Sequence, residues 1–284
     1  MKIAYYPGCS LQTMAKDYDM SARVVSEFLG IELVEIPDWN CCGASAAHAS
    51  SKYLPIALCA RNLHMVEQMG LDVTSPCAAC YQSLSYANWK LTGDPDLREK
   101  INDATGQPYQ GGVKIQSFIQ VFSKLTAEKI QSQVVQPLEG LKVAVYYGCL
   151  LVRPSNVVEI DDPEDPQILD NLIRATSAET VDWTHKVECC GGSLSVTNED
   201  ISLKLARDIL SSAAEAGAHC IITACPQCHF NLDMKQNKMN KVFNTDLKLP
   251  VFYFTQLLGL SLGIEPNCLG MDLMTAKAML SRIS

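Results

Sequence analysis

Short apolar runs alternate along the chain with longer segments whose apolar residues recur at helical spacing. Ile3–Tyr6 is an apolar run closed by a Pro-Gly pair, which predicts a short strand. Ser21–Leu29 carries apolar residues at the spacing of a helix and stops before Gly30, and Ile31–Ile36 alternates like a strand. The beginning of the chain is therefore predicted to run strand, helix, strand.

The alternation continues up to the first Cys-x-x-Cys motif. Tyr53–Met69 has a long helical pattern that ends at Gly70, and Val73–Thr74 is predicted to be a strand that leads into the motif. Strands that alternate with helices form mostly parallel sheets, because each helical crossover returns the chain to the same edge. We therefore expect an α/β fold whose functional side chains gather outside the carboxyl ends of the strands.

The whole order of elements occurs twice. Segments with matching residue patterns recur at the beginning, middle and end of each copy. They pair Lys2–Cys9 with Lys142–Cys149, Trp39–Ser45 with Val187–Ser193, Leu71–Cys77 with Cys220–Cys225, and Val113–Phe118 with Val251–Gln256. The polar run Gln131–Glu139, followed by Gly140, is typical of a joint. We therefore predict two pseudo-symmetric Rossmann-like halves, residues 1–138 and 139–284, each a mostly parallel sheet flanked by helices.

The repeat carries two matching sets of five cysteines. Each set has one cysteine, then an adjacent Cys-Cys-Gly, then Cys-x-x-Cys, with 34 residues between the Cys-Cys pair and Cys-x-x-Cys in both copies. From the first cysteine to the pair there are 31 residues in one copy and 39 in the other. The first set is Cys9, Cys41, Cys42, Cys77 and Cys80, and the second set is Cys149, Cys189, Cys190, Cys225 and Cys228. Because each motif follows a strand-like segment, both sets are expected at the carboxyl edges of their sheets.

Bulk composition narrows the classes of function. A net charge of -8 over 284 residues argues against nucleic acid or an anionic membrane as the main partner. The N-terminus has no secretory signal pattern, and the longest apolar stretch, Val251–Ile264, is too short to span a bilayer. We therefore expect a cytoplasmic protein, in which grouped cysteines hold metal or do redox chemistry more often than they form structural disulfides.

Iron–sulfur clusters account best for two sets of this kind. Thiolates are soft ligands, so all-cysteine sites select zinc or iron–sulfur. A zinc site takes four ligands, often from two Cys-x-x-Cys motifs, whereas each half here has one such motif and five cysteines. The side chains of adjacent cysteines diverge, which suits a group larger than a single ion. Zinc sites, disulfides and unrelated thiols stay open as alternatives.

The functional roles of the glycines and histidines near the two sets are less strongly indicated by the sequence than those of the cysteines. Gly43, Gly191 and Gly192 are expected to form turns and to bring backbone N–H groups close to cluster sulfurs. His48 follows the first Cys-Cys pair closely, and His229 follows the last cysteine of the second set directly. Both are candidate catalytic residues that donate a proton to a departing thiolate, with an ordinary polar role as the alternative.

Other polar and thiol residues have no repeated pattern. Cys59, Cys220 and Cys268 lie outside the repeat and are expected to be buried core thiols. Arg153 is a candidate contact for an anionic group, or a turn residue next to proline. The acidic segment Glu159–Asp165 is predicted to be a solvated loop.

The doubled pattern resembles the cysteine-rich CCG domain, and two copies in a chain of this size resemble the family of the heterodisulfide reductase B subunit. The resemblance covers nearly the whole chain. It implies that each set of five cysteines holds a noncubane 4Fe–4S cluster made of fused 3Fe–4S and 2Fe–2S parts. It also implies reduction of a small disulfide between the two clusters, such as the disulfide of coenzyme M and coenzyme B in methanogens. That reduction takes two electrons, so facing clusters would each supply one and capture one departing thiolate.

The resemblance further implies partners. The chain has no Gly-x-Gly-x-x-Gly loop and no ferredoxin-type cysteine run, so no flavin or nicotinamide site is expected in it. Electrons are then expected from the ferredoxin-like C subunit of the same complex and from its flavin-containing A subunit. The sequence around Cys9 and Cys41 is more similar to relatives in bacterial and archaeal redox complexes than to the methanogen form. The alternatives are a non-catalytic electron relay in a larger quinone- or acyl-CoA-linked complex, and a zinc-bound scaffold.

Overall fold

The computed structural model describes residues 1–44 and 47–281 and contains two four-stranded parallel sheets. The strand order is β2-β1-β3-β4 in the first sheet and β6-β5-β7-β8 in the second. The first sheet consists of β1 (Lys2–Tyr5), β2 (Glu32–Glu35), β3 (Val73–Ser75) and β4 (Ile115–Ser117). The second sheet consists of β5 (Lys142–Tyr146), β6 (Glu179–Thr180), β7 (Cys220–Thr223) and β8 (Val251–Tyr253). The equal strand order confirms the prediction of two pseudo-symmetric α/β halves.

Helices connect the strands and cover the sheets. In the first half they are α1 (Gly8–Gln12), α2 (Lys16–Phe28), α3 (Ala47–Ser50), α4 (Leu54–Met69), α5 (Ala78–Gly93), α6 (Pro95–Thr105), α7 (Phe118–Ser123) and α8 (Ala127–Gln131). In the second half they are α9 (Ile168–Arg174), η1 (Gly192–Leu194), α10 (Glu199–Glu215), α11 (Pro226–His229), η2 (Phe230–Met234), α12 (Gln236–Phe243), α13 (Phe254–Ser261), η3 (Pro266–Leu269) and α14 (Leu273–Leu280). Within the described residues, no helix has the length and apolar character needed to cross a bilayer.

The predicted element boundaries agree with the structure to within one or two residues, with α2 as the exception. This helix begins at Lys16, earlier than the predicted start at Ser21. Its first turn carries Asp17 and Asp19, whose carboxylates are favoured at the positive end of a helix. The end of α4 is as predicted, because Gly70 adopts the left-handed conformation (φ 63°) that closes a helix without strain.

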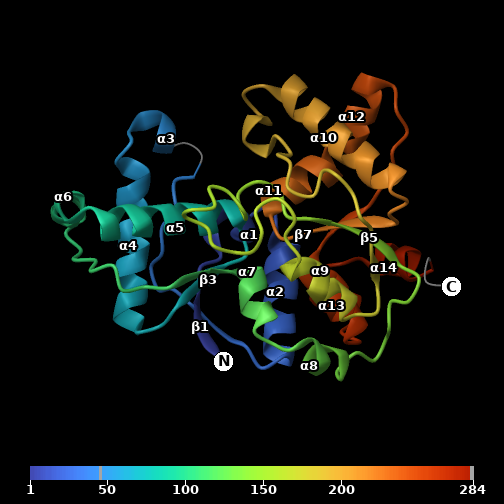
Figure 1. Ribbon diagram of the computed structural model, residues 1–284, viewed down its shortest axis with the longest axis horizontal. Coiled ribbons are helices and arrows are strands. Elements are labelled where there is room, and N and C mark those ends of the chain that lie inside the picture. The colour runs from blue at the N-terminus through green and yellow to red at the C-terminus, as the bar shows by residue number, and fades with distance from the viewer. Residues whose placement is uncertain (45–46, 282–284) are drawn as a thin grey trace.

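The two halves exchange helix contacts across their junction. Helix α2 of the first half packs on α13 of the second, and α9 of the second half packs on α7 of the first. Figure 1 shows α2 and α13 near each other in the middle of the molecule, between the two halves. The buried hydroxyls of Ser21 on α2 and Thr255 on α13 lie 2.7 Å apart. Helices of each half therefore complete the core of the other.

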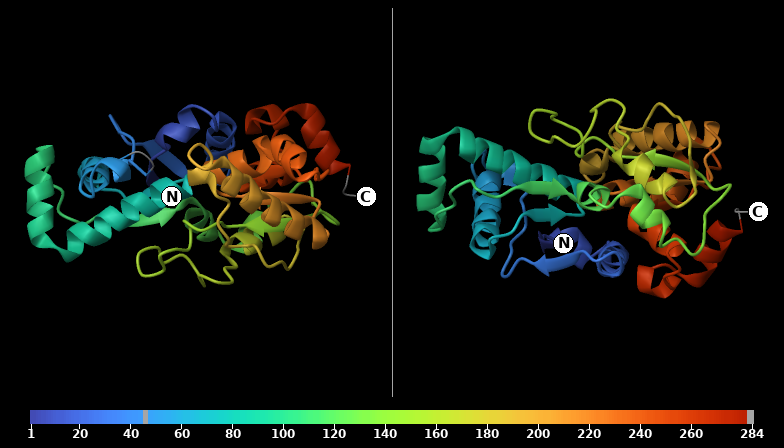
Figure 2. Two further views of the ribbon diagram at one scale, coloured as in Figure 1. Left: turned by 90° about the horizontal axis from the view of Figure 1, so that it is seen from above. Right: turned by 60° about the horizontal axis from the view of Figure 1, so that its bottom comes forward.

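An aromatic cluster fills the junction. The ring of Phe254 lies 5.9 Å from Phe118 and 5.3 Å from Phe122, both in edge-on orientations. These rings belong to one continuous hydrophobic core that runs through both halves. Figure 2 shows the halves side by side along the long axis of the molecule, with α6 at one end. Because the halves share a core, the predicted division into residues 1–138 and 139–284 stays a prediction.

Candidate metal centres

The first set of cysteines gathers at the carboxyl edge of the first sheet. Cys9 lies in α1 directly after β1, and the Cys-x-x-Cys motif begins α5 directly after β3. The Cys-Cys pair lies in the loop that follows β2. The sulfur of Cys9 is 4.0 Å from that of Cys41, and the sulfur of Cys42 is 3.4 Å from that of Cys80. Three segments that are distant in sequence thus bring their thiols together, as the strand pattern predicts.

The second set repeats this arrangement on the second sheet. Cys149 follows β5, and Cys225 follows β7 at the start of α11. The sulfur of Cys190 is 3.5 Å from that of Cys228, which matches the corresponding pair of the first set. The thiols of Cys149 and Cys189 influence each other, since each is the first cause of the other's pKa shift. All ten cysteines lie within the described ranges, and all ten are free thiols.

Glycines allow the backbone to approach the sulfurs closely. Gly8 has φ 70°, and a Cβ atom at this position would lie 2.8 Å from the sulfur of Cys80. Gly148 occupies the corresponding place in the second half, and its Cβ would lie 3.2 Å from the sulfur of Cys228. Both distances are shorter than ordinary van der Waals contact. A side chain at Gly8 would therefore displace a thiol of the first set.

Backbone N–H groups after each Cys-Cys pair point at the cysteine sulfurs. The N–H of Gly43 donates to Cys41 over 3.4 Å, and the N–H of Gly191 donates to Cys189 over the same distance. The N–H of Gly192 donates to Cys190 over 3.3 Å. These three glycines act as the sequence predicts, since hydrogen bonds from the backbone favour a negatively charged sulfur.

Two tyrosines at matched positions support the Cys-Cys loops. The hydroxyl of Tyr6 donates to the carbonyl oxygen of Asn40 over 2.7 Å, one residue before the first pair. The hydroxyl of Tyr146 donates to the carbonyl oxygen of Glu188 over 2.6 Å, one residue before the second pair. Both side chains are buried. A tyrosine precedes the Gly-Cys dipeptide in both copies of the repeat, and this recurrence is the sequence feature that could have predicted its hydrogen bond to the Cys-Cys loop. The spacing of the cysteines alone does not predict that bond.

Hydrogen bonds among the thiols shift their acidity in both sets. The pKa of Cys42 is lowered to about 3, first by its interaction with the thiol of Cys41 and then by that with the thiol of Cys80. The pKa of Cys189 is lowered to about 6, first by its interaction with the thiol of Cys149. Thiolates are the form of cysteine that binds metal. Each set therefore has at least one thiol that is ready to act as a ligand.

The residues of each set fit a multi-iron group better than one ion. Each set consists of five free thiols. Backbone N–H groups of the Cys-Cys-Gly turns donate to their sulfurs, and nearby glycines leave space around them. Among residues 1–44 and 47–281, no three Cys, His, Asp or Glu side chains converge closely enough to hold a single metal ion. A tetrahedral zinc site needs such convergence, whereas a cluster spreads its ligands over several metal atoms.

The two candidate histidines have different surroundings. His229 ends α11, half-buried, and its ring stacks on Tyr253 with 4.4 Å between the ring centres. Burial lowers the pKa of His229, and the nearby carboxylates of Asp233 and Asp17 act in the opposite direction. His48 is exposed on the short helix α3. The catalytic role of both histidines stays a prediction.

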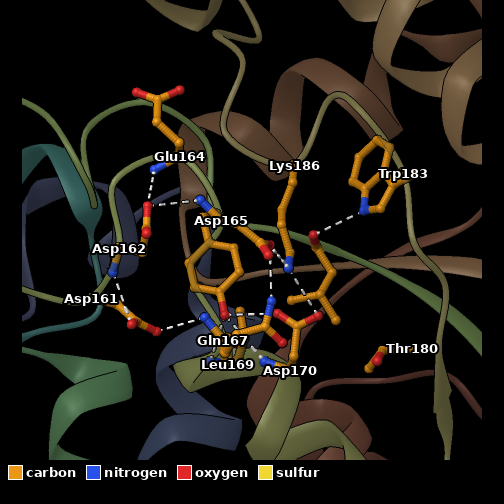
Figure 3. A network of polar contacts seen from close by, with 12 residues as sticks. Asp161, Asp162, Glu164, Asp165, Gln167, Leu169, Asp170, Thr180, Trp183 and Lys186 are labelled. Atoms are coloured by element: carbon orange, nitrogen blue, oxygen red, sulfur yellow. Dashed lines mark hydrogen bonds and ion pairs between the residues drawn. The ribbon is translucent and has the colours of Figure 1, made fainter.

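A buried ion pair braces the second set (Figure 3). The ammonium group of Lys186 lies 3.0 Å from Asp165 and 3.3 Å from the buried Asp170. Tyr147 donates its hydroxyl to Asp170 over 2.8 Å, and its N–H donates to the carbonyl of Lys186 over 2.9 Å. The N–H of Gly148 donates to the same carbonyl. This network ties the strand end before the first cysteine of the second set to the loop that carries its Cys-Cys pair.

The acidic segment Glu159–Asp165 is a mostly exposed loop, as predicted, and ion pairs hold it in place. Asp165 is exposed but pairs with the lysine of the buried network, and Glu164 forms an ion pair with Arg153 at 3.1 Å. Ile160 within the segment is buried. The guanidinium of Arg153 also donates to a carbonyl in the loop before the second Cys-Cys pair. Arg153 therefore anchors this loop, and a contact with an anionic group stays a prediction.

Two of the three cysteines outside the repeat are buried as predicted. Cys59 and Cys220 are core residues, and the thiol of Cys59 donates to the carbonyl oxygen of Cys42 over 3.3 Å. The expectation is wrong for Cys268, which is exposed on η3. The next residue, Leu269, takes the buried position of that short helix.

Comparison with known proteins gives a match on both halves. The family model described as a cysteine-rich domain, CCG, matches residues 3–85 and 143–233. The chain is 34% identical over 278 residues to the B subunit of the ferredoxin/F420H2-dependent CoB-CoM heterodisulfide reductase of Methanosarcina acetivorans, covering 95% of this chain and 92% of the relative. It is also 34% identical to the 8-methylmenaquinol:fumarate reductase membrane anchor subunit of Wolinella succinogenes, covering 95% of each chain.

A solved structure has a similar fold. The crystal structure of a hypothetical protein from Helicobacter pylori superposes with a TM-score of 0.77 and 14% sequence identity. The match covers 96% of this chain and 51% of the other, so the chain spans about half the length of that protein. At this identity the likeness shows a common fold alone.

Proposed function

Because the chain belongs to the family of proteins with two cysteine-rich CCG domains that includes the B subunit of heterodisulfide reductase, we propose that it is an iron–sulfur protein that reduces a small disulfide to two thiols. The first and second sets would each hold one noncubane 4Fe–4S cluster. Reduction of a disulfide consumes two electrons and two protons, and the two clusters would supply one electron each. The substrate would be the disulfide of coenzyme M and coenzyme B or a related disulfide.

The proposal rests chiefly on how the two sets are arranged. The two Cys-x-x-Cys motifs influence each other across the junction of the halves, since the backbone of Ala78 in the first motif helps to lower the pKa of Cys225 in the second. The outer cysteines Cys9, Cys41 and Cys189 are exposed. A substrate that arrives from solvent would therefore meet an exposed thiol of either set first.

Residues of this chain would bind the clusters and donate protons to the departing thiolates. The ten thiols supply the ligands, and the hydrogen bonds of Tyr6 and Tyr146 hold the Cys-Cys loops in place. His229 is adjacent to a cysteine of the second set and interacts with the half-buried Asp17, so we propose that it donates a proton to a departing thiolate. His48 is the candidate for the same task at the first set.

A second candidate function is electron relay without substrate chemistry. It is favoured by the relative from Wolinella succinogenes, whose name refers to a menaquinol:fumarate reductase rather than to a disulfide reductase. That relative matches the chain as closely as the methanogen protein does. In this alternative the two sets would pass electrons within a larger complex.

We further propose that the chain works in a cytoplasmic complex of several subunits. Both relatives are named as subunits of reductases. Two further subunits, one like a ferredoxin and one with a bound flavin, would deliver electrons.

Anaerobic purification followed by a turnover assay tests the proposal. We expect iron and acid-labile sulfide that correspond to two clusters per chain, and we expect reduced protein to convert a small disulfide into two thiols. Oxidation of the reduced protein by a quinone without thiol formation from any disulfide would favour the relay. A preparation with zinc and no sulfide would contradict both.

A further inference from the structure

The two sheets end in equivalent edge strands, β4 in the first half and β8 in the second. The sheet registers pair Ile115 with Val73 and Val251 with Ile221 on the neighbouring strands. Those neighbours pair in turn with the two alanines that the repeat matches on β1 and β5. Ile115 and Val251 therefore occupy the same position in the two halves.

The backbone N–H groups of these two residues point away from their sheets. The N–H of Val73 donates to the carbonyl oxygen of Lys114 over 3.0 Å, and the corresponding bond to the carbonyl before Val251 measures 2.9 Å. In a parallel ladder, the residue that follows such a carbonyl has its own N–H on the opposite side of the strand. The N–H groups of Ile115 and Val251 therefore lie on the outer edges of the two sheets.

The two edges differ in the acceptor that faces this N–H. The carboxylate of Asp233 accepts from the N–H of Val251 over 3.3 Å. Within the described residues, the N–H of Ile115 has no hydrogen-bond partner. Asp233 lies eight residues after the first cysteine of its Cys-x-x-Cys motif, and Ser85 takes that position in the first half. A short hydroxyl side chain thus stands where the second half has a carboxylate.

A groove lies beside Ile115 on this edge of the first sheet. It has a volume of about 430 Å³, and Ser85, Trp89, Lys114, Ile115 and Glu159 are among the residues that line it. The aspartate of the second half lines the corresponding groove there, which supports the match between the two edges. A groove of this volume is of the size that binds small molecules.

The donors that line the groove suit an anion. Ser85 is buried and carries a hydroxyl that can donate, and Lys114 is exposed with its charge available to the groove. Neither Lys114 nor the groove's own carboxylate, Glu159, forms an ion pair in the described part of the chain. A backbone N–H, a hydroxyl and an ammonium group therefore face the groove without a carboxylate between them.

We propose that this groove binds a small molecule through a carboxylate group, which accepts from the N–H of Ile115 and the hydroxyl of Ser85 and pairs with Lys114. The carboxylate of the ligand takes the place that Asp233 takes in the second half. Hydrogen bonds to an ionised acceptor are shorter and stronger than neutral ones, so the bound carboxylate has an advantage over water at this N–H. The inference goes beyond the proposed function, since no cysteine takes part in the site.

Calorimetric titration of the anaerobically prepared protein with succinate tests the site. The parent protein should bind succinate and should not bind succinamide, which has the same carbon chain without the charges. Ser85→Asp should abolish binding, because it supplies the internal carboxylate of the second half. Lys114→Met should weaken binding a few fold, whereas the control Lys129→Met, which removes an exposed lysine outside the groove, should leave it unchanged.

Hydrogen exchange measured by mass spectrometry locates the bound carboxylate. Succinate should slow exchange of the Ile115 amide, and in Ser85→Asp this amide should exchange slowly without succinate. Glu159→Gln tests the site without the serine substitution: it removes the groove's own negative charge and should bind succinate a few fold more tightly.

Two results would overturn the inference. One is a parent protein that does not bind succinate, and the other is equal binding by the parent, Lys114→Met and Glu159→Gln. Neither result depends on the iron and sulfide content of the protein. Failure of the proposed iron–sulfur function would therefore leave the inference standing, and failure of the inference would leave the proposed function intact.

Discussion

The hydroxyl of Tyr146 donates to the carbonyl oxygen of Glu188 over 2.6 Å and so ties the end of β5 to the loop that presents Cys189 and Cys190. The equivalent bond in the first half joins Tyr6 to Asn40. Each bond links two of the three segments that supply a set of cysteines. The shape of each set therefore depends on one buried tyrosine as well as on the thiols themselves.

Loss of either tyrosine hydroxyl should weaken one set selectively. We expect Tyr146→Phe to lower the free energy of unfolding by about 1 kcal/mol, because a buried carbonyl loses its donor. The iron of the second set should be released faster to a chelator, while that of the first set stays in place. Tyr6→Phe is the matched variant and should show the opposite selectivity. Equal release rates from both sets in either variant would contradict this prediction.

A methyl group at Gly8 should prevent assembly of the first set. Gly8→Ala places a Cβ 2.8 Å from the sulfur of Cys80 at a positive φ of 70°. Gly70→Ala is a control with similar backbone strain, since φ is 63° there and nothing lies within 4 Å of its Cβ. Both variants should lose about 1–2 kcal/mol to backbone strain. Only Gly8→Ala should also lose iron, as measured by metal analysis; equal iron contents would show that the approach to Cys80 is unimportant.

Removal of the charge on Lys186 should destabilise the second half in a pH-dependent way. Burial raises the pKa of Asp170, and the hydrogen bond from Tyr147 and the attraction of Lys186 oppose that rise. Lys186→Met removes the nearer cation of the buried carboxylate and leaves only Arg174 at 3.8 Å, which costs about 3–5 kcal/mol.

The sign of the pH dependence follows from the direction of that pKa shift. A carboxyl whose pKa is higher in the folded state binds more protons in that state than in the unfolded state. The free energy of unfolding therefore falls as the pH rises from the unfolded-state pKa of Asp170 to its folded-state pKa. Without Lys186 the folded-state pKa of Asp170 rises further, and the window extends to higher pH. Urea unfolding at several pH values between acid and neutral should therefore show that Lys186→Met loses more of its free energy of unfolding, relative to the parent protein, as the pH rises. The double variant Lys186→Met/Asp170→Asn should abolish this trend; its persistence there would assign it to another group.

Cysteines inside and outside the repeat should respond differently to the same change. Cys42→Ala removes a proposed ligand, so the protein should keep only about half of its iron if each set holds one cluster of equal size. Cys59→Ala removes a buried thiol that donates to the carbonyl of Cys42 over 3.3 Å. It should lower the free energy of unfolding by about 1 kcal/mol and leave the iron content unchanged. Loss of iron from Cys59→Ala would add this thiol to the ligands.

Much of the fold was predictable because the signals for it are local. The apolar run Ile3–Tyr6 and the stop at Gly70 depend on neighbouring residues, and the structure has β1 and the end of α4 at these places. The start of α2 was not predictable from apolar spacing, because its first turn has a single buried aromatic residue, Tyr18, between the acidic residues Asp17 and Asp19. The exposure of Cys268 depends on which side of η3 meets the core, and no local pattern shows that.

The sequence by itself determined the doubled α/β order and the ten cysteines at the carboxyl edges of two sheets, since strand and helix periodicities and motif spacing are properties of short segments. Only the tertiary structure decided that Tyr18 stacks on Tyr253 and that Lys186 pairs with Asp170. These contacts arise when α2 packs across the junction on α13 and when a loop folds back over β5. Their energies depend on burial, which is known only once the chain has folded.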